Sequence, residues 1–424
     1  MPSLPHHFHT TMQQAAGFEH QPTLAVAVSG GADSMALMWL AHDWTAKHGG
    51  KVVALTVNHN LRNEAHSEAE MVARQAAQLG IEHHTLPITI AEPSAAVQAQ
   101  ARTLRYQALE DFCHQHRILH LLTAHHQDDN IETLAMRAWR GSGVEGLSGI
   151  PFIRYTRQLR LLRPLLHTPK DALVQWLTSN HINWIDDPSN RSDDYERNRL
   201  RKHLTEWPVN RKQTQHFLTH MALANQAIQP KQAQLALDSI HLFPEGYLEL
   251  DTTCWPNHNH ESIISLLTRI IHSLGKGDTS PRYYQLGHLR TQLTDPQSKG
   301  CCLGGLQWTR ITPHQWRITR EIRALEGPTP LTSNRSHLWD NRFIIRCNTL
   351  PSHDYHIAAL GEQGLSQLNL PRSVLLTLPA IWRLDQLCFL PHIEGNVEEH
   401  LNDLITLTPR YRRPLLGTPQ RYLM

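Results

Sequence analysis

The first 210 residues alternate between short apolar runs and longer segments with helical periodicity. The apolar runs lie at 24–29, 51–59, 81–88 and 118–126, and the segments between them are long enough to form helices. Consecutive parallel strands need a helical crossover of this length, and such crossovers are right-handed. The sequence therefore predicts an α/β fold with a parallel, doubly wound sheet at 1–210.

The rest of the chain shows two other patterns. Helical periodicity dominates 200–237, whereas short strands and helices are mixed after Pro244. Residues 326–336 are rich in Pro, Ser and Thr, which is typical of a linker. We therefore expect three domains: the α/β domain at 1–210, a mainly helical central domain at 211–326, and a small mixed α/β C-terminal domain at 327–424.

Composition excludes several classes of protein. The 424 residues are 40% hydrophobic and 18% charged, as in globular domains. No stretch approaches eighteen uncharged apolar residues, so we expect no membrane partner. The N-terminus lacks the basic start and apolar run of a secretory signal, and the six cysteines form no CxxC pair. Both features favour a cytoplasmic location, where thiols stay reduced.

Net charge is only +2, but residues 154–212 hold twelve Lys or Arg against seven Asp or Glu. This local excess of basic residues fits phosphate binding, and it fits a solvated helix face equally well.

A glycine turn with an acidic residue follows the first apolar run, in the sequence SGGADS. Backbone N–H groups at the start of a helix bind anions, and Gly30 and Gly31 allow the backbone to approach a phosphate closely. Ser29 and Ser34 add hydroxyl donors, and Asp33 suits Mg²⁺ that bridges a carboxylate and a phosphate. The alternative is an ordinary strand-to-helix connection. The chain contains neither GxxxxGK(S/T) nor a GxGxxG after a strand, which disfavours those two nucleotide folds.

A second polar cluster follows the apolar run at 118–126. Asp128, Asp129 and Glu132 open a helix, where acids complement the helix dipole and cap its amides. Capping alone needs only one of them, so the cluster also indicates a binding site. In a doubly wound sheet this strand end and the glycine turn meet at the same crevice.

These motifs resemble those of a known superfamily and of one family within it. SGGxDS between a strand and a helix resembles the PP-loop of ATP pyrophosphatases, which cleave ATP between the α and β phosphates. HHQDDNIET with RGSGVEGLSGI is similar to the tRNA(Ile)-lysidine synthetases. VNHNLRNEAHSEA, QARTLRYQAL, LLRPLL and DDPSNRSDDYERNRLR match further segments of that family, densely over the first 200 residues and thinly beyond. Asn58 and Asn60 depart from it, because the family usually has Asp and Gly there.

The resemblance implies a function. Such enzymes ligate free L-lysine to the 2-position of the wobble cytidine in the CAU anticodon of tRNA(Ile), and they release AMP and pyrophosphate. ATP and Mg²⁺ are the implied cofactors, and tRNA(Ile) and lysine the partners. The resemblance implies that the first domain is a PP-loop ATP pyrophosphatase domain, and that the other two domains contact tRNA. A homodimer is one assembly left open.

The resemblance also implies roles for single residues. The implied catalytic residues are Asp33, Asp129, Arg197 and Arg201, with Asp33 and Asp129 holding the metal. ATP is expected to contact Ser29, Gly30, Gly31, Ala32, Asp33, Ser34, His59 and Arg62. The substrates are expected to contact His125, Asp128, Glu132, Arg140, Gly141, Gly143, Arg163, Asn190 and Asn198.

Several of these residues have alternative interpretations. Arg197 and Arg201 suit tRNA phosphates or plain surface charge as well as the α-phosphate. His125 and His126 are candidates to polarise the reacting base, but histidines at a strand end are more typical of hydrogen-bonded structural groups. Trp139, Trp176 and Trp184 have helical or strand spacing and are interpreted as core residues rather than base-stacking platforms.

Three rival functions remain open at this stage. Sulfur transferases of tRNA share the PP-loop, but they need reactive or cluster-binding cysteines, and Cys113 is the only cysteine before residue 254. Amidotransferase-type synthetases need ammonia from a glutaminase domain, of which the sequence shows no sign. A non-catalytic RNA-binding protein is disfavoured by the intact Asp33 and Asp129.

Overall fold

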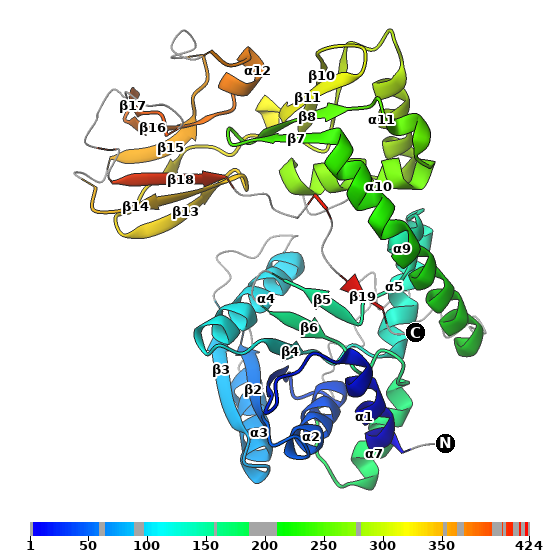
Figure 1. Cartoon of the computed structure of the whole chain (residues 1–424). Helices are drawn as coiled ribbons and strands as arrows, with labels where there is room; N and C mark the ends of the chain where they lie inside the picture. Colours follow the sequence, from blue (N-terminus) through cyan, green and yellow to red (C-terminus); the bar gives the residue numbers. More distant parts are fainter. Residues whose placement is uncertain are drawn as a thin grey trace. The chain divides into compact units, whose positions relative to one another are not determined.

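The structure is a computed structural model of the whole chain (Figure 1). Its contacts divide the chain into two compact units. Unit 1 comprises residues 1–140, 144–224 and 418–424, and unit 2 comprises 141–143 and 225–417. The structure describes residues 3–58, 64–88, 97–156, 159–185, 210–276, 281–350, 354–362, 369–391, 401, 404–409, 415–416 and 420–422.

Unit 1 contains the predicted alternation of strands and helices. Every strand and helix predicted in the first 141 residues is present, with ends shifted by a few residues. In chain order the elements are α1 (Leu4–Ala15), β1 (Thr23–Ala27), α2 (Ala32–Ala46), β2 (Lys51–Asn58), α3 (Glu64–Gln78), β3 (Glu82–Pro87), α4 (Val97–Gln115), β4 (His120–Leu122), α5 (Gln127–Trp139), α6 (Val144–Leu147), β5 (Ile153–Tyr155), β6 (Arg160–Leu162), α7 (Lys170–Ser179) and, near the C-terminus, β19 (Gln420–Arg421).

These strands form one seven-stranded sheet with the order β19-β5-β6-β4-β1-β2-β3. The five strands β6, β4, β1, β2 and β3 are parallel, and β5 and β19 pair antiparallel at one edge. From β1 the chain proceeds outward to β2 and β3, and it then returns to the opposite side of β1 to form β4. This reversal confirms the doubly wound fold.

Alternate side chains of the central strands enter two separate cores, as the pleat of a strand requires. Leu24 and Val26 of β1 pack with helices α1, α2, α3 and α7 on one face of the sheet. Ala25 of β1 and Val53 of β2 pack with α4 on the other face. Because both faces are covered, the strands are apolar without interruption, which is what made them recognisable in the sequence.

Unit 2 combines helices with three antiparallel sheets. Helix α9 (Arg211–Ser239) begins in unit 1, and the division between the units falls within it. The further elements are β7 (Ile240–Phe243), β8 (Tyr247–Asp251), η2 (Trp255–Asn257), α10 (His260–Leu274), α11 (Tyr283–Thr294), β9 (Gly300–Leu303), β10 (Leu306–Arg310), β11 (Gln315–Arg320), η3 (Ile322–Ala324), β12 (Thr329–Pro330), β13 (Arg335–Trp339), β14 (Phe343–Cys347), β15 (Tyr355–Ala359), α12 (Arg372–Leu375), β16 (Pro379–Arg383), β17 (Gln386–Phe389) and β18 (Ile405–Pro409).

The sheets of unit 2 have the orders β7-β8-β11-β10-β9, β12-β15-β16-β17 and β13-β14-β18. Helices α10 and α11 share a core with the first of these sheets, around Trp308 and Trp316. The helices and strands expected after residue 244 are therefore present. The division into domains at 1–210, 211–326 and 327–424 stays a prediction.

A buried ionic cluster joins segments on both sides of the expected linker at 326–336. The Asp340 carboxylate accepts hydrogen bonds from Arg320 at 2.8 Å and from Arg342 at 2.6 Å, and all three side chains are at most 2% exposed. Arg342 also donates to the carbonyls of Gly246 and Thr377. Burial lowers the pKa of Arg342 to about 10, while the charge of Asp340 opposes this change.

Asp340 should therefore be essential to the stability of unit 2. We expect Asp340→Asn to lower the free energy of unfolding by about 3 kcal/mol, because two buried guanidinium groups lose their counter-charge. Asparagine tolerates the positive φ of 50° at this position, so the backbone adds little to the loss. The measurement is urea unfolding followed by tryptophan fluorescence.

Glu362→Gln provides the matched control, because the Glu362–Arg372 pair is exposed and should contribute less than about 1 kcal/mol. Equal unfolding midpoints for the two variants would show that the buried cluster does not support the fold.

Candidate functional site

The crevice beside β1 and β4 is where the fold predicts a ligand site. In an open α/β sheet, ligands bind outside the carboxyl ends of the strands where the chain reverses its direction of winding. Here that point lies between β1 and β4, which pair in parallel from Leu24↔His120 to Val26↔Leu122. The two loops predicted to carry the chemistry follow these two strands directly.

The loop after β1 has the geometry of an anion cradle. The Ser34 hydroxyl accepts a hydrogen bond from the Ser29 amide at 3.1 Å and donates to the Gly31 carbonyl at 3.0 Å, which folds the loop onto the start of α2. The amide of Met35 donates to the same Gly31 carbonyl and forms the first hydrogen bond of the helix. The amides of residues 32–34 therefore precede the helical ladder and suit an anionic ligand.

Gly30 is required in this loop for two reasons. Its φ of +85° is a conformation that residues with a Cβ adopt only under strain. A Cβ at Gly30 would also lie 2.9 Å from the Cδ1 of Ile185. The Gly30 carbonyl accepts a hydrogen bond from the Ile185 amide at 2.9 Å, so the chain around residue 185 packs directly against the loop.

A buried histidine joins the two strand ends. The Nε2 atom of His126 lies 3.5 Å from an oxygen of Asp33, on the β1 side, and 3.5 Å from an oxygen of Asp129, on the β4 side. Its Nδ1 atom lies 3.7 Å from Asp128. Burial lowers the pKa of His126, but the hydrogen bond with Asp33 and the three nearby carboxylates outweigh burial and raise it above the ordinary value.

The two aspartates at the start of α5 also have structural roles. Asp129 accepts a hydrogen bond from the His126 amide at 3.0 Å and so caps the helix. Asp128 accepts one from the Lys170 amide at 3.0 Å and pairs with Arg211, also at 3.0 Å. The capping role weighed for these acids is therefore present, and both still lie at the crevice.

The structure adds two residues to the site. For His126 the sequence favours a structural role over polarisation of the reacting base, and it indicates no role for Lys170. The Nζ atom of Lys170, at the start of α7, lies 4.0 Å from the Asp33 carboxylate. Lys170 and Asp33 are 170 − 33 = 137 positions apart in the chain, so no local pattern could indicate this contact.

The carboxylates fit the expected Mg²⁺. Within the part of the chain that the structure describes, no three His, Cys, Asp or Glu side chains form a complete metal site. Mg²⁺ commonly takes only one or two carboxylates and completes its ligands with water and substrate phosphates. Asp33 and Asp129, both in contact with the same imidazole nitrogen beside an anion cradle, are suited to that role.

Three other residues predicted to bind substrate, His125, Glu132 and Arg163, have contacts or burial that the structure describes. His125 contacts the Thr123 hydroxyl at 3.1 Å, and Glu132 is buried in α5. Arg163 follows β6, is 5% exposed and donates to the Pro151 carbonyl at 2.7 Å. Burial lowers the pKa of Arg163 to about 10. Arg163 therefore holds the backbone beside the site through a buried hydrogen bond.

The C-terminal end of α5 carries the remaining described residues of this set. Arg140 ends the helix, and Gly141 follows with a φ of +67°. A Cβ at Gly143 would meet the Glu261 carboxylate of α10 at 2.6 Å. Six predicted site residues lie outside the residues that the structure describes: His59, Arg62, Asn190, Arg197, Asn198 and Arg201.

The interpretation of Trp139 as a core residue was wrong. Its side chain is 91% exposed, because the buried residues of α5 all lie in the first half of the helix and residues 138–140 at its end are exposed. Trp176 and Trp184 do pack against the core of unit 1, as predicted.

Comparison with known proteins decides the family. A model of PP-loop domains matches residues 4–207. A tRNA(Ile)-lysidine synthase from Orientia tsutsugamushi (strain Boryong) is 29% identical, over 93% of this chain and 94% of its own. One from Ruegeria pomeroyi is 34% identical, over 87% of this chain and 88% of its own. The chain belongs to the tRNA(Ile)-lysidine synthase family. A solved U34-tRNA thiolase, NcsA from Methanococcus maripaludis, is 14% identical with a TM-score of 0.43 over 50% of this chain and 77% of its own.

Membership of the tRNA(Ile)-lysidine synthase family confirms the predicted PP-loop superfamily and the predicted enzyme class, a ligase of tRNA modification. ATP use follows from the PP-loop domain. No helix among the residues described here is long and apolar enough to cross a membrane.

The geometry of the loop makes a direct prediction about ATP binding. We expect Gly30→Ala to weaken ATP binding at least ~tenfold, because the new Cβ adds backbone strain and displaces Ile185 from the cradle. Isothermal titration calorimetry with ATP measures the effect.

Gly80→Ala is the matched control, because Gly80 also has a positive φ, of +65°, but a Cβ there meets no atom within 4 Å. It carries the same kind of backbone strain outside the loop and should leave ATP binding unchanged. A similar loss in both variants would mean that backbone strain alone, and not the cradle, weakens binding.

Proposed function

We propose that this protein ligates L-lysine to the 2-position of the wobble cytidine in the CAU anticodon of tRNA(Ile), through an adenylated cytidine. The observation that carries the proposal is the meeting of an anion cradle with two carboxylates from different strand ends, at Asp33 and Asp129. The cradle suits the phosphates of ATP, and the carboxylates suit the cations that the reaction needs.

The proposed reaction has two steps. In the first, the 2-carbonyl oxygen of the cytidine attacks the α-phosphorus of ATP, the bond to the β-phosphate breaks, and pyrophosphate leaves. In the second, the ε-amine of lysine attacks carbon 2 and loses a proton, and AMP leaves with the former carbonyl oxygen. Adenylation therefore converts a poor leaving group into a good one.

The residues of the PP-loop position the phosphates. Ser29–Ser34 would hold the pyrophosphate through amides and hydroxyls, with His59 and Arg62 as further ATP contacts. Asp33 and Asp129 would hold Mg²⁺, which when bound supplies positive charge to the phosphate oxygens. The ammonium of Lys170, near Asp33, adds a second cation on the same side of the crevice.

The substrates require other partners. Free lysine needs a carboxylate for an ammonium group, and Asp128, Asp129 and Glu132 are the acids of α5 that can supply it. Arg197 and Arg201 are our candidates to stabilise charge on the α-phosphate. The remaining predicted substrate contacts are kept as part of this proposal: His125, Arg140, Gly141, Gly143, Arg163, Asn190 and Asn198.

The environment of Cys113 argues against the closest rival, sulfur transfer. Its side chain is fully buried, and burial, with Glu110 adding to the effect, raises the pKa of the thiol to about 12. The thiolate is the reactive form of cysteine, so Cys113 is unsuited to carry sulfur at neutral pH.

The proposed reaction predicts a strict dependence on both substrates. With α-labelled ATP, lysine and tRNA(Ile) bearing a CAU anticodon, we expect labelled AMP and the incorporation of lysine into the tRNA. Thin-layer chromatography of the label and scintillation counting of labelled lysine measure the two products. Equal release of AMP with an unrelated tRNA, or without lysine in multiple-turnover conditions, would contradict the proposal.

Asp33 should act in the adenylation step and not in tRNA binding. We expect Asp33→Asn to reduce formation of the adenylate by about a hundredfold or more, because a charge that supports the transition state is removed. The affinity for tRNA, measured by filter binding, should stay near that of the unmodified protein.

Asp43→Asn serves as the control, since Asp43 lies on the same helix α2 with a side chain that is 52% exposed. It should change neither quantity. A loss of tRNA binding in Asp33→Asn would instead assign Asp33 a structural role.

A further inference from the structure

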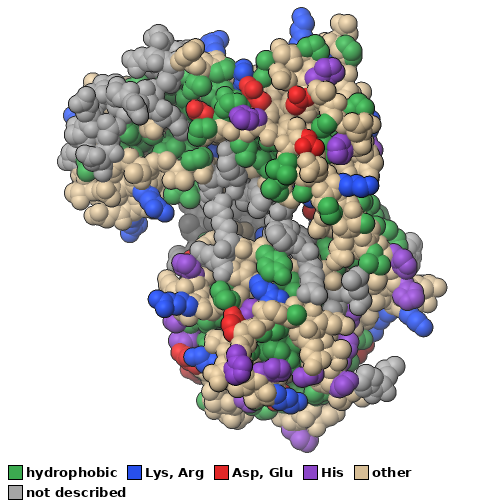
Figure 2. Space-filling view, in the orientation of Figure 1, with side chains coloured by type: hydrophobic (Ala, Val, Ile, Leu, Met, Phe, Trp, Pro, Cys, Tyr) green, Lys and Arg blue, Asp and Glu red, His purple; other side chains and the backbone are tan. Residues whose placement is uncertain are grey.

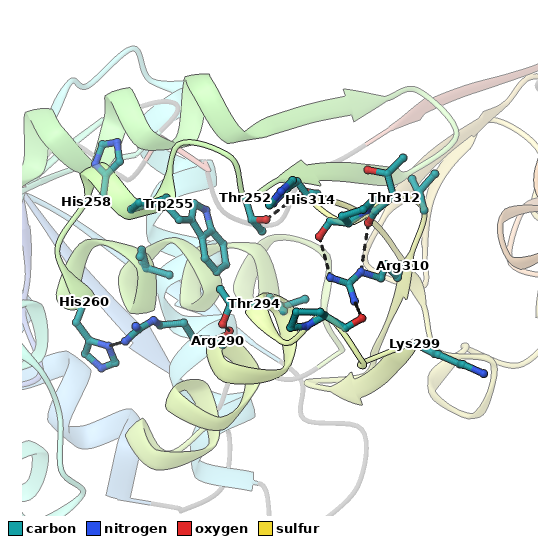
Figure 3. A pocket seen from close by; sticks show the side chains of 16 residues that line it. Thr252, Trp255, His258, His260, Arg290, Thr294, Lys299, Arg310, Thr312 and His314 are labelled. Atoms are coloured by element: carbon teal, nitrogen blue, oxygen red, sulfur yellow. Dashed lines mark hydrogen bonds between the residues drawn. The ribbon is translucent and has the colours of Figure 1, made fainter.

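Unit 2 contains a second site that the proposed reaction does not use. A pocket of about 950 Å³ lies between η2, the start of α10, the end of α11 and the loops next to β9 and β10 (Figure 3). On the face shown in Figure 2, the described Lys and Arg side chains lie scattered rather than in one basic patch.

Among the described residues, the Lys and Arg side chains that line the pocket are not balanced by lining carboxylates. Its lining includes Arg290, Lys299 and Arg310 with three histidines, and none of the described residues that line it is an Asp or Glu. A concave surface whose Lys and Arg side chains face no lining Asp or Glu concentrates anionic ligands.

Arg310 shapes this pocket by holding two of its loops together. Its guanidinium donates to the carbonyls of Asp295, Pro296 and Ser298 on one loop, and to those of Thr312 and Pro313 on the other. Figure 3 shows this group turned toward the backbone around Thr312. Because these carbonyls occupy its donors, Arg310 holds the two loops in place and is a positioning residue, not a ligand contact.

The donors of Arg290 are not occupied in this way by backbone carbonyls of the described residues. It is half-buried, and its Nη1 donates to the Nδ1 of His260 (Figure 3). Among the described residues it forms no ion pair, and Glu261 of α10 instead accepts a hydrogen bond from the Tyr283 hydroxyl. The buried arginines of the same unit differ in this respect, since Arg320 and Arg342 share the Asp340 carboxylate. A partly buried cation without a counter-ion favours an anion as its ligand.

The contact between Arg290 and His260 also orients the imidazole. A guanidinium can only donate, so the Nδ1 of His260 is the acceptor in this contact. The Nε2 of the same ring is the nitrogen left for a ligand beside the Arg290 guanidinium.

Part of the lining of the pocket is apolar and rigid. Pro256, Pro296 and Pro313 contribute rings that fix their own backbone, and Ile311, which also lines the pocket, is 39% exposed. A preformed apolar wall binds a flat, weakly polar group without a large loss of conformational entropy.

We propose that this pocket binds a nucleoside phosphate, with the phosphate on Arg290 and His260 and the base against the proline-rich wall. Arginine matches phosphate oxygens through paired N–H donors, and the wall suits the face of a base. A free nucleotide and a single-stranded nucleotide of RNA present the same chemistry. This site is independent of the ATP cradle, because all of its residues belong to unit 2.

Photolabelling of the full-length protein with radioactive 8-azido-AMP, followed by peptide mapping, tests the proposal. We expect label in the peptides containing residues 255–263 or 290–299, in addition to label near the PP-loop. Arg290→Gln should reduce the label in unit 2 at least ~tenfold. Label near the PP-loop should persist and shows that unit 1 is folded, and an unchanged tryptophan fluorescence spectrum, to which the buried Trp308 and Trp316 contribute, shows that unit 2 is folded. Arg290→Lys, which keeps the charge, should retain part of the label in unit 2.

Arg323→Gln is the charge-matched control, because Arg323 is exposed in the same unit and does not line the pocket. Competition separates the two sources of ligand. Stronger competition by AMP identifies a free nucleotide, and stronger competition by a single-stranded RNA pentamer identifies an RNA strand. The proposal is overturned by absence of label in these peptides, by unchanged label in Arg290→Gln, or by adenosine competing as well as AMP.

Discussion

The short parallel pairing of β1 with β4 is the constraint on which the candidate site depends. Only three residue pairs join the two strands, from Leu24↔His120 to Val26↔Leu122. Because the strands run in the same direction and end together, the loop that begins near Ser29 and the loop that begins at Thr123 leave the sheet side by side. A different strand order would leave both motifs intact in the sequence and separate them in space.

This convergence creates an electrostatic conflict that His126 resolves. Asp33 and Asp129 repel each other when both are ionised. The buried imidazole in contact with both carboxylates offsets the repulsion, and in return they raise its pKa. Asp129 also caps α5, so the helix that supports the site and the charge of the site depend on the same side chain.

Local patterns in the sequence predicted those parts of the molecule that local structure determines. The strands of unit 1 were recognisable because burial on both faces makes them uniformly apolar, and Ser29–Ser34 because a turn with Gly30 at positive φ needs glycine. Contacts between distant segments left no such pattern. Lys170 reaches Asp33 only through the tertiary fold, and Trp139 has helical spacing although its side chain is exposed. The ionic cluster at Asp340 crosses a segment whose composition indicated a linker.

The two anion sites show why one was visible in the sequence and the other was not. The cradle of unit 1 binds through backbone amides, so it needs a particular backbone conformation and therefore a glycine motif. The pocket of unit 2 depends on side chains, and its form comes from Arg310 donating to five backbone carbonyls. Any residue type can supply a carbonyl, so this arrangement constrains almost no neighbouring position. What distinguishes Arg290 from Arg310 is which donors remain for a ligand, and that property exists only in the folded chain.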